Sequence, residues 1–278
     1  ITFNSNGGSL VDSKTIEHGT TLNEPSPPSR TGYTFNGWYT DQNLSNAFDF
    51  STPVTEDMTL YAKWVANTYT VTFNAGDGDV APVTQTKQFD STYDNKDVLP
   101  VPTRIGYTFI GWNTKEDGTG DEITNKTVVS IANNHTLYAQ WKINEYTVTF
   151  EDHDGMELEV VTVNHGDSAK APSNPTREGY TFTGWNKSFE NVTKNLTVTA
   201  QYDINQYTVT FNSNGGSSVE SISADYNTKI TEPKLPTRTG YTFKGWYTDS
   251  TFDKEWNFET EKVPASNLTL HAKWTANK

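Results

Sequence analysis

Five histidines are the side chains of this sequence best suited to proton transfer or metal binding: His18, His135, His153, His165 and His271. Histidine is the commonest metal ligand in proteins, but a metal site needs further ligands at a fixed spacing. No two of the five have such a spacing on one predicted element, and the pattern His-Glu-x-x-His does not occur. We therefore expect structural or solvated roles for all five, and no metal-ligating residues.

Two acidic turns are the next candidates for a bound cation. They are Asp77-Gly78-Asp79 and Glu151-Asp152-His153-Asp154-Gly155. Calcium takes about six to eight oxygen ligands, and the twelve-residue calcium-loop pattern is absent from both. We expect both turns to be solvated.

Motifs of the common catalytic classes are also missing. The chain contains no Gly-x-Ser-x-Gly, no phosphate-binding loop and no Gly-x-Gly-x-x-Gly after a strand. Carboxylates are plentiful, as a glycosidase would require, but none recurs with a fixed partner. The absence of cysteine excludes thiolate zinc sites, disulfides and cysteine nucleophiles. We expect no catalytic residues, no cofactor and no enzymatic activity.

Composition narrows the class of protein further. Hydrophobic residues make up 33% of the 278 residues, and aromatic residues make up 13%, which is too many for a disordered chain. The net charge of −13 disfavours nucleic acid and anionic lipid as partners. No apolar run is long enough to span a membrane, so we expect no membrane insertion by this segment.

An internal repeat is the strongest signal in the sequence. Tyr-Thr-Val-Thr-Phe occurs three times, and the chain opens on a truncated copy. Gly-Tyr-Thr-Phe-x-Gly-Trp and a closing string such as Leu-Tyr-Ala-Lys-Trp each occur four times. These blocks divide the chain into module 1 (residues 1–67), module 2 (68–144), module 3 (145–205, the shortest) and module 4 (206–278).

Each repeated block alternates large and small residues with a period of two, which predicts strands. Asn6-Gly7-Gly8 and Asn214-Gly215-Gly216 follow the first strand and predict a hairpin into a second one. Trp38 is out of phase with Tyr33 and Phe35 in its block. Either Trp38 covers the opposite face, or a bulge at Gly37 returns it to the core; we favour the bulge.

A proline-bearing stretch separates the second and third predicted strands of every module. Prolines exclude a long helix but permit one short turn of helix before them, for example around Thr228–Thr231. The predicted module is thus a four-stranded sheet with at most one short helix, an α+β fold that is mostly β.

Together these motifs resemble the Listeria–Bacteroides repeat, the B-repeat of internalin-type surface proteins. The resemblance covers essentially the whole chain; modules 2 and 3 depart from it where Asn113 and Asn186 replace the tyrosine found at Tyr39 and Tyr247. It implies small ubiquitin- or SUMO-like β-grasp modules in tandem, displayed on a bacterial cell surface as part of a longer exported protein. The family offers no catalytic residues to transfer.

Three functions stay open at this stage. We favour a non-catalytic extracellular repeat segment of a bacterial surface protein that acts as a stalk, as a multivalent module that binds a host-cell or cell-wall component weakly, or as both. The alternatives are a mechanical spacer without a ligand and a carbohydrate-binding accessory module. Tryptophan and tyrosine could form a sugar-stacking platform, but their repeated positions favour the core. Phe252 and Trp256 lie outside the repeated blocks and are expected to be partly exposed. Seven glycosylation sequons, including those at Asn43 and Asn267, carry little weight in an Asn/Thr-rich chain. The ligand-binding residues stay unknown.

The junctions between modules predict their arrangement. Four residues separate the closing aromatic from the next opening tyrosine, as in Trp64 to Tyr69, and they include no glycine or proline. Such a linker is too short and too apolar for a flexible tether. We expect an extended rod in which each module touches only its neighbours.

Overall fold

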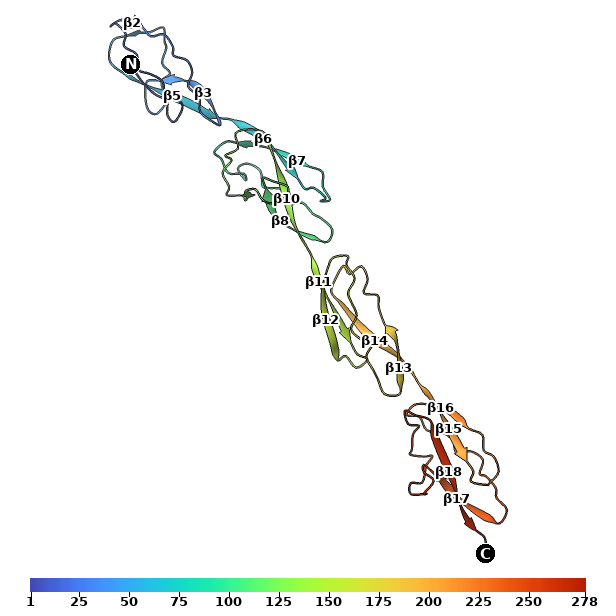
Figure 1. Ribbon diagram of the computed structural model, residues 1–278. Helices are drawn as coiled ribbons and strands as arrows, with labels where there is room; N and C mark the ends of the chain where they lie inside the picture. Colours follow the sequence, from blue (N-terminus) through green and yellow to red (C-terminus); the bar gives the residue numbers. More distant parts are fainter. The chain divides into compact units, whose positions relative to one another are not determined.

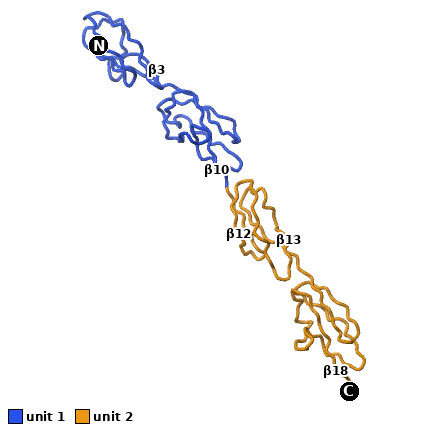
Figure 2. Tube along the Cα trace, viewed as in Figure 1, with its two compact units in different colours: residues 1–144 blue, residues 145–278 orange.

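The computed structural model describes residues 1–278 and contains eighteen strands and no helix (Figure 1). The chain divides into two compact units, unit 1 (Ile1–Asn144) and unit 2 (Glu145–Lys278), which Figure 2 shows in blue and orange. Each unit holds two separate hydrophobic cores.

In unit 1 the first sheet has three strands in the order β1 (Thr2–Asn4), β5 (Thr59–Ala66) and β3 (Tyr33–Tyr39). The first strand runs parallel to the last one, and the middle strand is antiparallel to it. A small antiparallel pair, β2 (Thr20–Thr21) and β4 (Pro53–Val54), lies outside this sheet.

The second sheet of unit 1 has five strands in the order β7-β6-β10-β8-β9. Again the opening strand β6 is parallel to the closing strand β10, and β8 is antiparallel to β10. The strands are β6 (Thr68–Asn74), β7 (Val83–Gln88), β8 (Tyr107–Asn113), β9 (Glu122–Ile123) and β10 (His135–Ile143).

Unit 2 contains two four-stranded sheets with the orders β12-β11-β14-β13 and β16-β15-β18-β17. Both have the same parallel pairing of opening and closing strands. Their strands are β11 (Glu145–Glu151), β12 (Glu157–Asn164), β13 (Tyr180–Trp185), β14 (Leu196–Ile204), β15 (Gln206–Asn212), β16 (Ile222–Asp225), β17 (Tyr241–Tyr247) and β18 (Leu268–Ala276).

One aliphatic residue of the closing strand lies at the centre of each core. Leu60, Leu137, Val198 and Leu270 occupy equivalent positions and are all completely buried. Each of these residues lies opposite a residue of the opening strand, so one face of the parallel pair of opening and closing strands lines the core. Aromatic rings pack on this face. In module 4, for example, the ring centroids of Phe211 and Phe243 lie 4.9 and 5.4 Å from that of Trp246.

The predicted bulge before the tryptophan is confirmed. In β3 the register shifts between Phe35 and Trp38, and Gly37 has φ +92°. The same shift occurs in the equivalent strand of each of the other three sheets. The extra residue turns Trp38 to the core face, where it lies opposite Ala62 and is only 2% exposed.

The expected α+β β-grasp fold is wrong, because the modules are all-β. No helix forms around Thr228–Thr231 or in the equivalent stretch of any other module. A surface helix needs an apolar stripe at helical spacing. The stretch before Pro233 instead buries one apolar side chain, Ile230, just as the equivalent stretch of module 1 buries Leu22. One buried apolar side chain is enough to hold an extended connecting segment against the core, but it does not provide the apolar stripe that a helix needs.

The hairpin expectation holds in only one of its two places. Asn6 and Asn214 both have positive φ, 46° and 47°, and each begins a tight turn with the following glycine. In module 4 the turn leads to β16, which pairs with β15. In module 1 no strand pairs with the outer edge of β1, and Ile1, next to β1, is bonded to Lys14 through both its amino group and its carbonyl.

Candidate functional site

The repeated tryptophans are part of the cores and do not form a sugar platform. Trp38, Trp112 and Trp246 are at most 2% exposed. The closing-strand tryptophans are half-buried, and each indole N–H donates to a backbone carbonyl after the opening strand: Trp64 to Ser5 at 2.8 Å, Trp141 to Ala75 at 3.1 Å and Trp274 to Ser213 at 2.8 Å. These bonds tie the last strand to the first turn.

Module 3 makes this tie with different chemistry, and one of the acidic turns takes part. Tyr202 stands where the other modules have tryptophan, and its hydroxyl donates to the Asp152 carboxylate at 2.7 Å. Asp152 is buried and also accepts a bond from the His153 amide at 2.7 Å. Burial opposes ionisation of Asp152, yet the bonds from Tyr202 and His153 hold the pKa of this carboxyl below its ordinary value. Burial, with Asp152 beside it, raises the pKa of Tyr202 to about 12.

Asp152, His153 and Asp154 are the one group of three metal-capable side chains whose ligand atoms lie within 4.8 Å of one another. His153 Nδ1 lies 3.2 Å from Asp152, whose carboxylate already accepts the Tyr202 hydroxyl. Asp154 and His153 are exposed on the turn. The turn therefore uses its one buried carboxylate for an internal bond, and its other groups face solvent.

We predict that the Tyr202–Asp152 bond makes module 3 sensitive to acid. The folded-state pKa of Asp152 lies below its unfolded value, so the carboxylate stabilises the fold above the unfolded pKa of about 4, and this contribution is lost as the pH falls through the folded pKa. Tyr202→Phe should lower the free energy of unfolding by about 1.5–3 kcal/mol at neutral pH, the usual size for a bond to a charged group. It should also flatten the acid dependence.

Thermal melting of wild type and variant between neutral pH and pH about 3 measures both effects. Tyr180→Phe is the matched control, because it removes a hydroxyl from the same module without removing a side-chain hydrogen bond. An unchanged acid dependence in Tyr202→Phe would contradict the prediction.

The histidines lie apart, except that His153 joins the acidic turn. His135 is structural: its Nε2 lies 2.8 Å from the hydroxyl of the buried Tyr93, and its Nδ1 lies 2.9 Å from the Asn133 carbonyl. The Asn133 carbonyl can only accept, so Nδ1 is the donor in that bond. His18 is exposed, whereas His165 and His271 are half-buried.

The acidic turn Asp77-Gly78-Asp79 and the aromatic residues Phe252 and Trp256 make surface or core contacts that need no ligand to explain them. Asp77 forms an exposed ion pair with Arg104 at 3.2 Å. Phe252 is half-buried against Tyr247, with ring centroids 5.7 Å apart. The expectation that Trp256 is partly exposed is wrong, because it is only 6% exposed and belongs to the core of module 4.

Three sequon asparagines have a structural use that the sequence did not reveal. Each accepts the backbone N–H of the residue after the opening tyrosine, at 2.9 to 3.0 Å. The pairs are Asn134 with Thr70, Asn195 with Thr147 and Asn267 with Thr208. Their recurrence just before the closing strand was the available signal.

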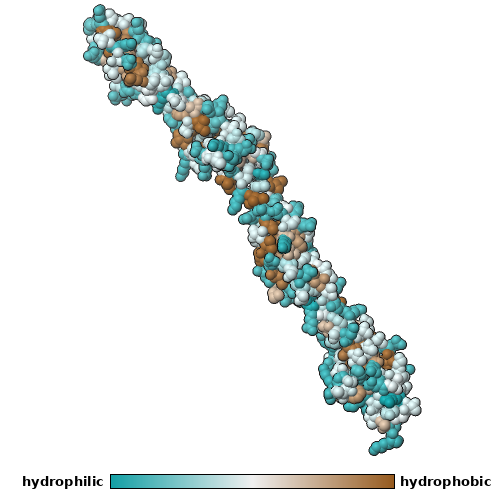
Figure 3. All heavy atoms as spheres, in the orientation of Figure 1, coloured by the Kyte–Doolittle hydropathy of each residue, from teal (hydrophilic) through white to brown (hydrophobic).

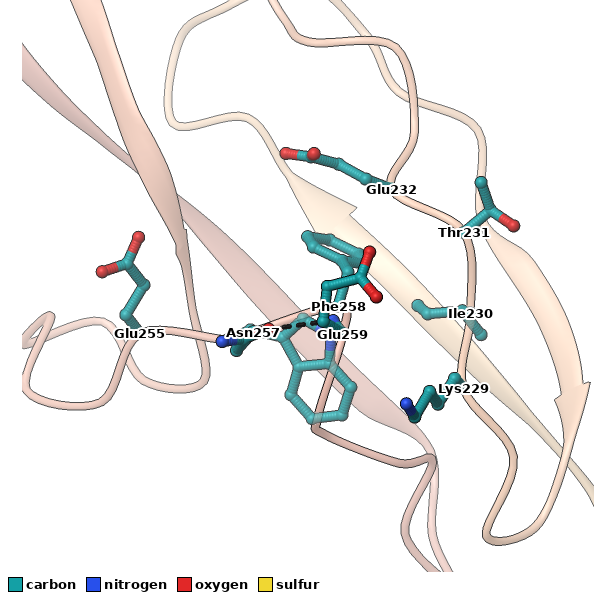
Figure 4. Close-up of a pocket in the computed structure, with 9 residues that line it drawn as sticks. Lys229, Ile230, Thr231, Glu232, Glu255, Asn257, Phe258 and Glu259 are labelled. Carbon is teal, nitrogen blue, oxygen red and sulfur yellow. Dashed lines mark hydrogen bonds between the residues drawn. The ribbon is translucent and has the colours of Figure 1, made fainter.

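A hollow lies beside the segment that connects the second and third strands of module 4. Lys229–Glu232 form one wall, and Glu255–Glu259 form the other. Figure 4 shows the carboxylates of Glu232, Glu255 and Glu259 pointing in different directions. A glycosidase needs two carboxylates facing one bond, and these three do not converge in that way.

The surface offers no single large apolar area on the face seen in Figure 3, where hydrophobic residues form separate small patches. The most exposed apolar side chains include Leu10, Val98, Val101 and Ile105. No helix of sufficient length and hydropathy to cross a membrane is present.

Four related modules, each with its own hydrophobic core and the same parallel pairing of opening and closing strands, define a repeat-array protein. The Listeria-Bacteroides repeat domain matches residues 1–63, 69–140, 146–205 and 207–273, and the chain belongs to this family.

Named relatives place the family in two bacterial genera. A protein of Evansella cellulosilytica named as a Gly-rich membrane protein is 39% identical over 90% of this chain and 31% of its own length. A second Evansella membrane protein is 34% identical over the whole chain and 44% of its own length. Internalin H of Listeria monocytogenes is 41% identical over 48% of this chain and 25% of its own length. The chain thus spans less than half the length of each relative.

Proposed function

We propose that this chain is a non-catalytic extracellular segment of a bacterial surface protein that serves as a stalk, with multivalent weak adhesion as a secondary role. The observation that carries the proposal is the junction inside each unit. In unit 1 a single residue, Asn67, separates β5 from β6; in unit 2 a single residue, Asn205, separates β14 from β15. A one-residue connection holds neighbouring modules at a fixed separation, as a spacer requires.

The family supports the surface location. The two Evansella relatives are named membrane proteins, and the third relative is named an internalin. Adhesion would be a second role that depends on the repeated modules, because several weak binding sites on one chain raise the avidity for a partner without any new contact. The partner would be a host-cell or cell-wall component, protein or glycan.

Small-angle X-ray scattering of the 278-residue chain tests the stalk. Four modules in line should give a radius of gyration of about 35 Å, against about 19 Å for one compact globule of this length. A value near 20 Å would mean that the modules pack side by side, and the stalk would be wrong.

Carbohydrate binding is the rival that aromatic content suggests. Binding of the chain to purified cell-wall fragments and to a glycan array distinguishes it from a ligand-free spacer. Saturable glycan binding by the isolated chain would favour the accessory-module reading, and it would leave the scattering result unaffected.

A further inference from the structure

The asparagine at the junction inside each unit is bonded to both of its neighbouring modules. In unit 1 the Asn67 amide donates to the Gly32 carbonyl at 2.9 Å, and its side-chain oxygen accepts the Thr34 hydroxyl at 2.6 Å. Its carbonyl accepts the Phe89 amide of module 2 at 2.8 Å. Unit 2 repeats these three bonds at Asn205, with Gly179, Thr181 and Tyr226 as the partners, at 2.9, 2.6 and 2.8 Å.

The residue bonded to the asparagine carbonyl is aromatic in both units, and its ring lies on the glycine of the preceding module. A Cβ at Gly32 would meet the Phe89 ring at 2.3 Å, and a Cβ at Gly179 would meet the Tyr226 ring at 2.1 Å. Both glycines are buried. Neither position has room for even a methyl group while the ring is in place.

The tyrosine after the glycine completes the contact. Tyr33 meets Phe89 edge-to-face with centroids 5.6 Å apart, and Tyr180 meets Tyr226 in the same way at 6.1 Å. An arginine guanidinium covers the tyrosine ring, 3.9 Å from Tyr33 and 3.6 Å from Tyr180, and so fixes its orientation. The Tyr33 hydroxyl also donates to Asp90 of module 2.

In module 4 the residues Gly240, Tyr241 and Asn277 form the same arrangement, which we call the corner, and no ring lies against Gly240. The Asn277 amide donates to Gly240 at 2.9 Å, the Thr242 hydroxyl donates to Asn277 at 2.7 Å, and Arg238 lies 3.9 Å from the Tyr241 ring. Gly240 has φ +79°, identical to that of Gly32, yet a Cβ there would meet nothing within 4 Å. The corner is therefore formed by its own module and does not depend on an occupant.

We propose that this glycine–tyrosine–asparagine corner is a docking surface whose partner is the aromatic residue after the second strand of a following repeat module, and that the corner at Gly240 accepts a further module in the same way. The paired glycine and ring lock neighbouring modules together. The glycine is thus required twice, for its positive φ and for the space that the ring of the next module occupies.

A comparison of two glycines separates these requirements. Alanine at Gly240 meets only the unfavourable φ, whereas alanine at Gly32 meets the same φ and the Phe89 ring. In the full chain, Gly32→Ala should lower the melting temperature of unit 1 by on the order of 5 °C more than Gly240→Ala lowers that of unit 2. Hydrogen exchange at the Phe89 amide should accelerate by about tenfold. In a Phe89→Ala background, Gly32→Ala should be no more harmful than Gly240→Ala.

The open corner is tested by extending the chain. Joining a second copy of residues 207–278 after Lys278 reproduces the native spacing between Asn205 and Tyr207. The ring of the added copy should then dock on Gly240, so that Gly240→Ala becomes as harmful in the extended chain as Gly179→Ala is in the natural one.

Either of two results would overturn the proposal. One is equal destabilisation by Gly32→Ala and Gly240→Ala that Phe89→Ala does not alter, which would leave backbone strain as the whole effect. The other is a Gly240→Ala effect that stays mild after extension, which would show that the corner does not accept a further module. Both outcomes are independent of whether the chain acts as a stalk or an adhesin.

Discussion

Trp246→Ala should lower the stability of module 4 by about 3–5 kcal/mol, most of what a domain of this size has. Trp246 is 1% exposed, and its indole packs on Phe211 and Phe243. Truncation leaves a cavity between these rings that a small sheet cannot close. Calorimetry of the full chain, with residues 206–278 expressed alone as a second sample, measures the loss.

Trp246→Phe is the matched control. The buried Trp246 Nε1 has no hydrogen-bond partner, so phenylalanine removes an unsatisfied donor while it retains a ring. We expect a much smaller loss than for alanine. An alanine variant that melts within a couple of degrees of wild type would show that the indole is not a core residue, and would revive a ligand platform.

Leu137→Ala should unfold module 2 selectively, with a loss of about 2–5 kcal/mol. Leu137 lies on β10, opposite Phe73 of the parallel strand β6, and is completely buried. It belongs to a core separate from that of module 1. Hydrogen exchange should show lost protection in β6, β8 and β10, with β14 and β18 unchanged. This result would show that the core of module 2 unfolds independently of those of modules 3 and 4.

The exposed Ile110→Ala serves as the control in the same sheet. Ile110 is 59% exposed, and a surface truncation of this kind is expected to change stability by less than about 0.5 kcal/mol. Equal loss of protection in all four sheets of Leu137→Ala would mean that the cores fold as one unit, and the modular division would fail.

The strands and the bulge could be predicted because they depend on side chains close together in the sequence. Alternation in Tyr207–Phe211 and the glycine before Trp38 each specify a local backbone geometry, and both expectations agree with the structure. The helix could not be excluded from sequence, because prolines restrict only their immediate neighbours. What decides the crossover is that Ile230 alone reaches the core, a fact of tertiary packing.

The corner between modules escaped prediction for a similar reason. The glycine before Tyr33 reads as an ordinary turn glycine, and its second constraint comes from a ring 57 residues away in sequence at Phe89. The Tyr202–Asp152 bond was hidden in the same manner. In the sequence, Asp152 and Tyr202 appear as two separate differences between module 3 and the other modules. Only their contact in the structure shows that the two differences compensate each other.

The parallel pairing of opening and closing strands determines how a module bears tension. The chain enters at the start of one strand and leaves at the end of its parallel neighbour, as in β15 and β18. A pulling force on the two ends therefore slides the strands past each other and loads their hydrogen bonds together in shear. Strands joined as a hairpin would instead be peeled apart one bond at a time. Each module is consequently arranged to resist a force that pulls on its two ends.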